Sequence, residues 1–239
     1  MTFAPFRREG AGVHTGARGV VTIHPCAESR GIVFATAHGE IPFRPESLAS
    51  DARGATDLVA GEARVRTVEH LVAALAWFGV GGARIDVVGP EIPILDGSAL
   101  PWCEALLAAG ASPVRRFWRP LEPAVVDLGS SRAEMALLGE GESPRLEVEI
   151  DFGDRAVGPR RAVFRPLEDD FVSRIAPART FAFADDVAAL HGAELALGGS
   201  LSCALVLGDR GPMNPEGMRF SDEPARHKRR ERIGTQDTR

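Results

Sequence analysis

The sequence predicts an α+β fold built from two structurally similar halves. Apolar alternation typical of strands is followed by apolar spacing typical of helices, and this order occurs twice along the chain. A basic, proline-interrupted connector at Val114–Pro123 separates the two occurrences. The chain has 239 residues, 44% of them hydrophobic and 26% charged, which suffices for one large or two small cores and excludes a disordered chain. We therefore expect a first domain at 1–118 and a second at 119–239.

The elements of the first half follow from local patterns. Gly19–Cys26 and Gly31–Ala37 alternate and are rich in β-branched residues, so we expect them to be paired strands. Thr67–Phe78 is expected to be a helix, because its leucines recur on one face and a glycine follows. A strand at Ala83–Val88 then precedes a turn-rich segment and a second helix, Leu100–Ala109.

The second half repeats this order. Its expected strands are Ala124–Leu128, Ala133–Leu138 and Arg145–Phe152. A helix near Pro166–Ile175 follows, then a strand–helix–strand unit across Thr180–Leu207 and a helical stretch around Asp222–Arg232. No direct sequence repeat is visible, so element order alone supports the duplication.

Charge and cysteine content limit the partners and the compartment. The net charge of −5 gives no reason to expect nucleic acid or an anionic membrane, and the basic run Arg226–Arg232 lacks interleaved aromatic residues. The three cysteines show no CxxC spacing, which favours reduced thiols. There is no signal-peptide pattern and no apolar run near the ~20 residues of a membrane helix. We expect a cytoplasmic protein without membrane insertion.

Two short histidine patterns could carry metal chemistry. Glu69 and His70 are adjacent on the first helix, so their side chains point ~100° apart, and a metal on His70 would leave Glu69 beside it. His227 and Glu231 are four apart and share a helical face. With one histidine from elsewhere they make a His₂–carboxylate set, which is typical of catalytic zinc. The alternatives are an exposed Glu–His pair and a solvated basic helix.

The other histidines carry weaker signals. His14 lies in a glycine-rich turn, where functional and structural roles are equally favoured. Structural roles are expected for His24, His38 and His191, and a turn role for Asp96, which Gly97 follows. No GxSxG, HExxH, P-loop or GxGxxG motif is present, which argues against the corresponding hydrolases and nucleotide-binding proteins.

Long motifs spread over the chain carry a family resemblance. In order they are GAGVHTG, TVEHLVAALAWFGV, GPEIPILDGSALPW, PARTFAF, LGGSLSCALV, MRFSDEPARHK and a trailing IG. The chain resembles the UDP-3-O-acyl-N-acetylglucosamine deacetylases of Gram-negative bacteria, zinc enzymes that commit the cell to lipid A synthesis. The resemblance covers about Glu9 to Gly234.

The resemblance implies a duplicated fold. Two two-layer α/β sandwich domains pack their helices between sheets, and each domain has an insert, here about Ser50–Arg66 and Ala178–Leu207. The second insert would form an apolar passage for the acyl chain, lined by Phe181, Phe183, Val187, Leu190, Leu195 and Leu197. The family's closing strand and helix are missing, so we expect the second domain to be incomplete and truncated at its C-terminus.

Site roles also follow from the resemblance. His70 and His227 match the zinc-binding histidines, and Glu231 stands where the family has an aspartate as third ligand. Glu69 matches the general base, and Thr180 matches a threonine that stabilises the oxyanion. The residues expected at the small-molecule substrate are Lys228, Asp151, Phe152, Phe181, Asp186 and His14. The implied reaction is zinc-dependent removal of the N-acetyl group from UDP-3-O-acyl-N-acetylglucosamine, by a chain for which a monomer is favoured.

Departures from the family pattern keep alternatives open. Glu231 replaces aspartate, Asp154-Arg155 replaces a His-Pro pair, and the chain stops before the Gly-His segment that carries the family's catalytic acid. One alternative is a catalytically weak or inactive truncated paralogue that binds the UDP-sugar lipid. Another is a truncated or frameshifted product with little function. Iron(II) could occupy the same ligands as zinc.

Overall fold

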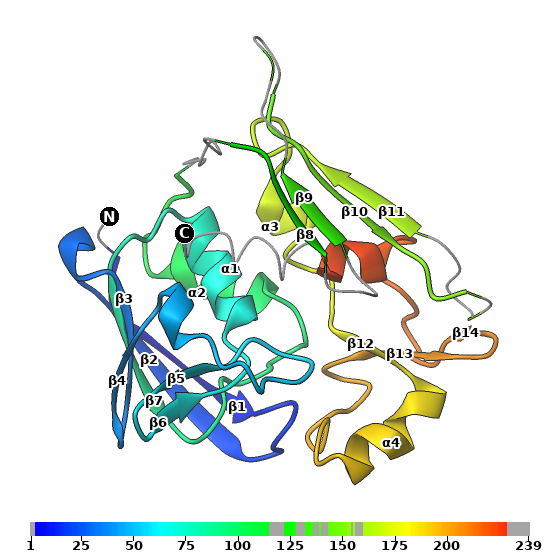
Figure 1. The fold of residues 1–239 in the computed structure, drawn as a ribbon, viewed down its shortest axis with the longest axis horizontal. Coiled ribbons are helices and arrows are strands. Elements are labelled where there is room, and N and C mark those ends of the chain that lie inside the picture. The colour runs from blue at the N-terminus through cyan, green and yellow to red at the C-terminus, as the bar shows by residue number, and fades with distance from the viewer. Residues whose placement is uncertain are drawn as a thin grey trace.

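The computed structural model describes residues 3–114, 122–127, 132–135, 139, 143–153, 155 and 160–228. Mixed sheets and short helices confirm the α+β class. The first half holds a five-stranded sheet in the order β1-β2-β7-β3-β4, and its helices α1 and α2 lie on the face turned toward the second half (Figure 1). The bounds are β1 Phe6–Ala11, β2 Arg18–Pro25, β3 Ile32–Thr36, β4 Gly39–Pro42, α1 Glu69–Trp77, β7 Ala83–Val88 and α2 Leu100–Ala108.

The expected pairing of Gly19–Cys26 with Gly31–Ala37 is wrong. These segments form β2 and β3, but β7 lies between them, antiparallel to β2 and parallel to β3. The register aligns Ile85 with both Ile23 and Phe34, and all three side chains are fully buried. Burying that row under the helices decides the strand order, which alternation within one strand cannot show. Strand β1, whose centre is charged and exposed, was not predicted.

Helix α1 is the centre of the core. All of its residues except Ala76 are buried, and it ends where Gly79 adopts φ 63°. At α2, the amides of Ala99 and Leu100 both donate to the carbonyl of Ala176, at 3.0 and 3.1 Å. A backbone group of the second half therefore satisfies the N-terminus of a first-half helix.

The second half contains further small sheets. Its elements are β8 Ala124–Asp127, β9 Arg132–Met135, β10 Leu146–Ile150, β11 Arg160–Phe164, α3 Phe171–Arg174, β12 Phe181–Phe183, α4 Val187–Gly192, β13 Leu205–Gly208 and β14 Gly211–Pro212. Parallel pairing of β12 with β13 around α4 confirms the strand–helix–strand unit. The hairpin of β5 (Leu58–Ala60) and β6 (Ala63–Val65) occupies the first predicted insert.

Two expectations in the second half need correction. The helix expected near Pro166–Ile175 begins only at Phe171, because the Asp170 carboxylate accepts from the amides of Val172 and Ser173 and caps the helix there. Strand β11 was not predicted, since arginines open it. Residues 223–228 are helical, while the rest of the expected stretch to Arg232 lies outside the described residues.

One core joins the two halves. The Trp77 ring on α1 stacks on Phe171 at 5.4 Å between ring centroids and lies 5.9 Å from Phe164. These second-half aromatics belong to the same buried cluster as the first-half helices. The connector at 115–121 lies outside the described residues, and the domain bounds and the duplication stay predictions.

A glycine at the junction supports the first stability prediction. Gly97 has φ 84°, and a Cβ there would collide with the carbonyl oxygen of Cys203. Gly97→Ala should therefore lower the free energy of unfolding by about 2–3 kcal/mol, measured by urea denaturation. The control is Gly31→Ala, which shares a positive φ of 65° but has no atom within 4 Å of the added methyl group. Equal losses in both variants would contradict the role of the close approach.

Candidate functional site

Glu69 and His70 open helix α1 and are both buried, at 4% and 3% exposure. The Glu69 carboxylate accepts a hydrogen bond from the Thr56 amide at 3.0 Å, so the loop that carries Thr56 closes over it. The helix N-terminus also favours a negative charge at this position. The exposed-pair alternative for Glu69 and His70 is excluded by their burial.

A strained residue fixes the start of α1. Thr67 adopts φ 60°, which is costly for a β-branched residue. Its hydroxyl donates to the Glu91 carboxylate at 2.7 Å, and its amide donates to Asp57 at 3.3 Å. These contacts hold the turn that places Glu69 two residues later. Sequence reasoning missed both acids, since each is distant from Glu69 along the chain.

The structure brings His227 to His70. His227 lies on the helical segment 223–228 and is 2% exposed, and the centroids of the two imidazole rings are 5.7 Å apart at 79°. Figure 1 shows this segment between the β8–β11 strands and the β12–β13 pair. The two candidate ligands, 157 residues apart in the sequence, therefore lie together in the buried part of the molecule, and Glu69 immediately precedes His70 on α1.

This donor set suits a transition metal. Imidazole nitrogens bind zinc at about 2.0–2.1 Å, so two rings at this separation can share one ion, and neutral imidazole with carboxylate is the usual catalytic combination. Glu231, the expected third ligand, lies outside the described residues. Within the described residues, no group of three or more histidine, cysteine or acidic side chains is close enough to hold an ion.

Aromatic side chains line the neighbourhood of His227. The Phe181 ring meets the His227 ring edge-on at 5.9 Å, and Lys228 Nζ lies 5.9 Å from the centre of Phe181. Phe152 contacts both Phe181 and Phe183, at 5.7 and 5.2 Å between centroids. The cluster joins the end of β10 to β12 and forms an apolar wall next to the histidines. Leu197, one of the residues expected to line the apolar passage for the acyl chain, is 51% exposed.

Thr180 and the acidic residues expected at the substrate are held by local contacts. The Thr180 amide donates to Gly97 at 2.7 Å, and its carbonyl accepts from Leu205 at 2.8 Å. Asp186 forms a two-pronged ion pair with Arg155, at 2.6 and 3.1 Å, and Arg155 also lies over the Phe183 ring. The Asp151 carboxylate accepts from the Gly153 amide in a turn. Asp154 lies outside the described residues.

His14 is buried between the loop that carries Gly54 and the segment that carries Ala196. Its Nδ1 accepts from the Ala196 amide at 3.4 Å, and its ring lies against Gly54. Its own amide donates to Glu91 at 3.0 Å. Burial lowers the pKa of His14 below its ordinary value; Arg66 also lowers it, whereas Glu91, Asp57 and a hydrogen bond to the Gly54 backbone oppose the shift. Burial raises the pKa of Glu91, but hydrogen bonds from His14, Thr15 and Thr67 outweigh this and leave it below the ordinary value.

These shifts predict acid destabilisation. The unfolded chain binds a proton on His14 first as the pH falls below about 6.5, while the folded chain does not, so stability decreases from that pH downward. Glu91 adds a second loss below about pH 4.5, since its folded carboxylate resists protonation. Urea midpoints between pH 8 and 4 measure both effects. His14→Gln should flatten the slope between pH 6.5 and 5; an unchanged slope would contradict the assignment.

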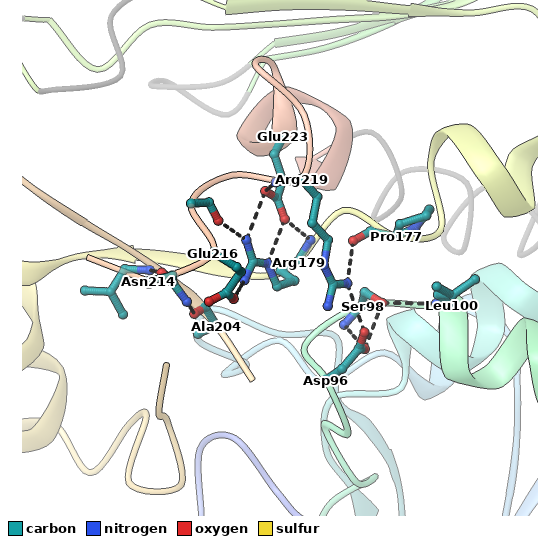
Figure 2. Close-up of polar contacts among 12 residues, drawn as sticks. Asp96, Ser98, Leu100, Pro177, Arg179, Ala204, Asn214, Glu216, Arg219 and Glu223 are labelled. Atoms are coloured by element: carbon teal, nitrogen blue, oxygen red, sulfur yellow. Dashed lines mark hydrogen bonds and ion pairs between the residues drawn. The ribbon is translucent and has the colours of Figure 1, made fainter. Parts of the chain in front are cut away.

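A buried ion pair near Thr180 was also missed. Arg179 is 1% exposed, and its guanidinium donates to Glu223 at 2.9 and 3.3 Å and to the Gly217 carbonyl at 2.7 Å. Figure 2 shows Arg179 between Glu216 and Glu223, and Arg219 turned toward Asp96. The turn role of Asp96 is confirmed by its bonds to the amide and hydroxyl of Ser98, and its other oxygen binds Arg219 at 2.9 Å.

The fold and the site define an α+β protein with a buried carboxylate–imidazole centre between its halves. The chain matches the sequence model of the UDP-3-O-acyl N-acetylglycosamine deacetylase family over residues 3–235. A protein named UDP-3-O-acyl-N-acetylglucosamine deacetylase from Thermosynechococcus vestitus is 42% identical, over 92% of this chain and 77% of that relative. Proteins with the same name from Phenylobacterium zucineum and Vibrio cholerae are 40% and 37% identical, over 97% and 94% of this chain and 80% and 76% of the relatives.

The chain belongs to the UDP-3-O-acyl N-acetylglycosamine deacetylase family. Membership confirms the resemblance drawn from the motifs. Within the part of the chain that the structure describes, no helix has both the length and the apolarity to cross a membrane.

Proposed function

We propose that this protein hydrolyses the acetamide of UDP-3-O-acyl-N-acetylglucosamine, the committed step of lipid A synthesis, with zinc as its metal. The names of its relatives support the substrate and the reaction. The observation that carries the proposal is the meeting of two buried imidazoles, His70 and His227, beside the buried carboxylate of Glu69. His70 and His227 would hold the ion, with Glu231 as the proposed third ligand.

The chain's own groups then have distinct tasks. When bound, zinc would polarise the acetamide carbonyl and lower the pKa of a water molecule toward neutrality. Glu69 accepts the proton of the attacking water, since its carboxylate stands next to the metal ligand and is oriented by the Thr56 amide. As the acetamide C–N bond breaks, that proton passes to the leaving amine and the acetyl group leaves as acetate. Thr180, held at both backbone groups, offers its hydroxyl to the developing oxyanion.

Substrate binding uses the surroundings of His227. Phe152, Phe181 and Phe183 provide the apolar contact for the acyl chain. Lys228, next to His227 and near Phe181, supplies a positive charge for the nucleotide-sugar. Asp186 is engaged by Arg155, so it acts on the substrate as part of that ion pair. The roles of Asp151 and His14 in binding and the cytoplasmic location stay predictions.

Metal content and acetate release on one sample test the proposal. Purified, zinc-supplemented protein should hold about one zinc per chain and release acetate from UDP-3-O-acyl-N-acetylglucosamine. His70→Gln should lose most of the zinc and the turnover and stay folded by circular dichroism, while His38→Gln, on an exposed turn, should change neither. Folded wild-type protein that binds the UDP-lipid in calorimetry but releases no acetate would favour a binding protein.

A further inference from the structure

We propose that Arg179 and Glu223 form a positioning pair that sets where His227 stands relative to His70, Thr180 and Phe181. This inference rests on the proposed function, because it concerns the same metal site. Neither residue is among the proposed metal ligands or substrate contacts, so both act through their neighbours along the chain. The argument starts from the contacts of the pair.

Arg179 and Glu223 are held by more contacts than a simple ion pair. Glu223 is fully buried, and one of its oxygens accepts from both the backbone amide and Nε of Arg179, at 3.0 and 2.9 Å. Its other oxygen accepts from Arg179 Nη2 at 3.3 Å and from the Arg219 amide at 2.6 Å. The remaining donors of Arg179 reach Glu216 and the Gly217 carbonyl. Charges buried this deeply are costly, and fixing the register of packed elements is their best-attested use.

Both members of the pair are close along the chain to residues of the candidate site. Arg179 immediately precedes Thr180 and Phe181. Glu223 and His227 are four residues apart on the helical segment 223–228, so their side chains lie on one face. That face meets the 179–181 segment at two points, Glu223 on Arg179 and His227 on Phe181. A slide of one helical turn, about 5.4 Å, would break both contacts and withdraw His227 from His70.

A third contact anchors this register to the first half. Arg219, whose amide binds Glu223, donates its guanidinium to Asp96 and to the Pro177 carbonyl, both at 2.9 Å. Next to Asp96, Gly97 accepts the amide of Thr180 at 2.7 Å. The network therefore ties the turn before α2 to both segments that carry the second-half site residues (Figure 2).

Zinc affinity of the variants tests the proposal with the metal alone as probe. Glu223→Gln keeps the shape and removes the charge, and Arg179→Lys keeps the charge and removes the multi-pronged donor geometry. Each should weaken zinc binding by about 10–100-fold in chelator competition, the usual effect of altering the support of metal ligands. The visible spectrum of cobalt-loaded protein should also change. In turnover, kcat should fall by a larger factor than KM rises, since His227 is displaced directly while the acyl-chain contact between Phe152 and Phe183 remains.

Asp222→Asn provides the matched control. Asp222 immediately precedes the helical segment 223–228 and pairs with Arg226 at 2.7 Å, but the described contacts do not connect it to Arg179. It should leave zinc affinity and kcat within about twofold of wild type. All measurements are made at a temperature where each variant is folded by circular dichroism, and Arg179→Lys serves if Glu223→Gln does not fold.

Two results would overturn the inference in distinguishable ways. Wild-type protein that binds no zinc and releases no acetate overturns the proposed function, and the inference with it. The positioning role alone is overturned if the wild-type protein binds zinc and releases acetate and a folded Glu223→Gln or Arg179→Lys variant matches it in zinc affinity and kcat.

Discussion

Glu69→Gln is expected to lower kcat by about 10²–10⁴-fold, the usual cost of losing a general base. The amide still accepts the hydrogen bond from Thr56, so the start of α1 should keep its shape. It cannot accept a proton from water at neutral pH, so only the chemical step should suffer. Zinc affinity should stay within a few-fold of wild type, because Glu69 lies beside the proposed ligands and is not one of them. Steady-state kinetics and metal analysis of the same sample measure the two effects.

The control for this change is Glu104→Gln. Glu104 lies exposed on α2, so its substitution removes the same charge without touching the site. Its kcat should match wild type. If Glu69→Gln retained more than about a tenth of wild-type kcat, well above the range expected for a lost base, Glu69 would not be the general base.

Arg179→Met is expected to lower the free energy of unfolding by roughly 3 kcal/mol. It leaves Glu223 fully buried without its charge partner, and breaking a buried pair in this way costs about 3–5 kcal/mol. The loss of unfolding free energy should lie at the low end of this range, because the backbone amides of Arg179 and Arg219 still donate to the Glu223 carboxylate. Urea denaturation at pH 7 measures the loss.

The contrast is with an exposed ion pair. Arg64 pairs with Asp51 at 2.7 Å near the surface, where such a pair contributes at most about 1 kcal/mol. Asp51→Asn should therefore change the unfolding free energy far less than Arg179→Met. Equal small losses in the two variants would show that Glu223 finds another partner or takes up a proton at little cost.

Local sequence pattern predicted those elements that local forces decide. Helix α1 was predicted within two residues at its start and one at its end, because its apolar residues recur at helical spacing and Gly79 ends it. The turn role of Asp96 was also predicted from local pattern, because Gly97 follows it, and its carboxylate accepts a hydrogen bond from Ser98 two residues later. The start of α3 differs from the expected one, because the Asp170 carboxylate caps the helix at Phe171.

The pairing of strands depends on contacts between distant segments and not on local pattern. Strands β2 and β3 were recognised, but β7 separates them in the sheet. Alternation shows which side chains of one strand face the core and carries no information on which strand lies next to it. Burial of Ile23, Phe34 and Ile85 in one row under α1 and α2 settles the order.

The sequence by itself determined the family, the Glu69–His70 pair at a helix start and the candidate role of His227, because each depends on neighbouring residues. The resemblance already implied that His70 and His227 meet, and the tertiary structure added their burial and ring geometry. Only the tertiary structure decided that Thr67 is held by Glu91 and that Arg179 is buried against Glu223. The physical reason is that charges and imidazoles leave water only where distant segments supply their partners. Which segments supply these partners depends on tertiary packing, and the spacing of residues along the chain does not predict it.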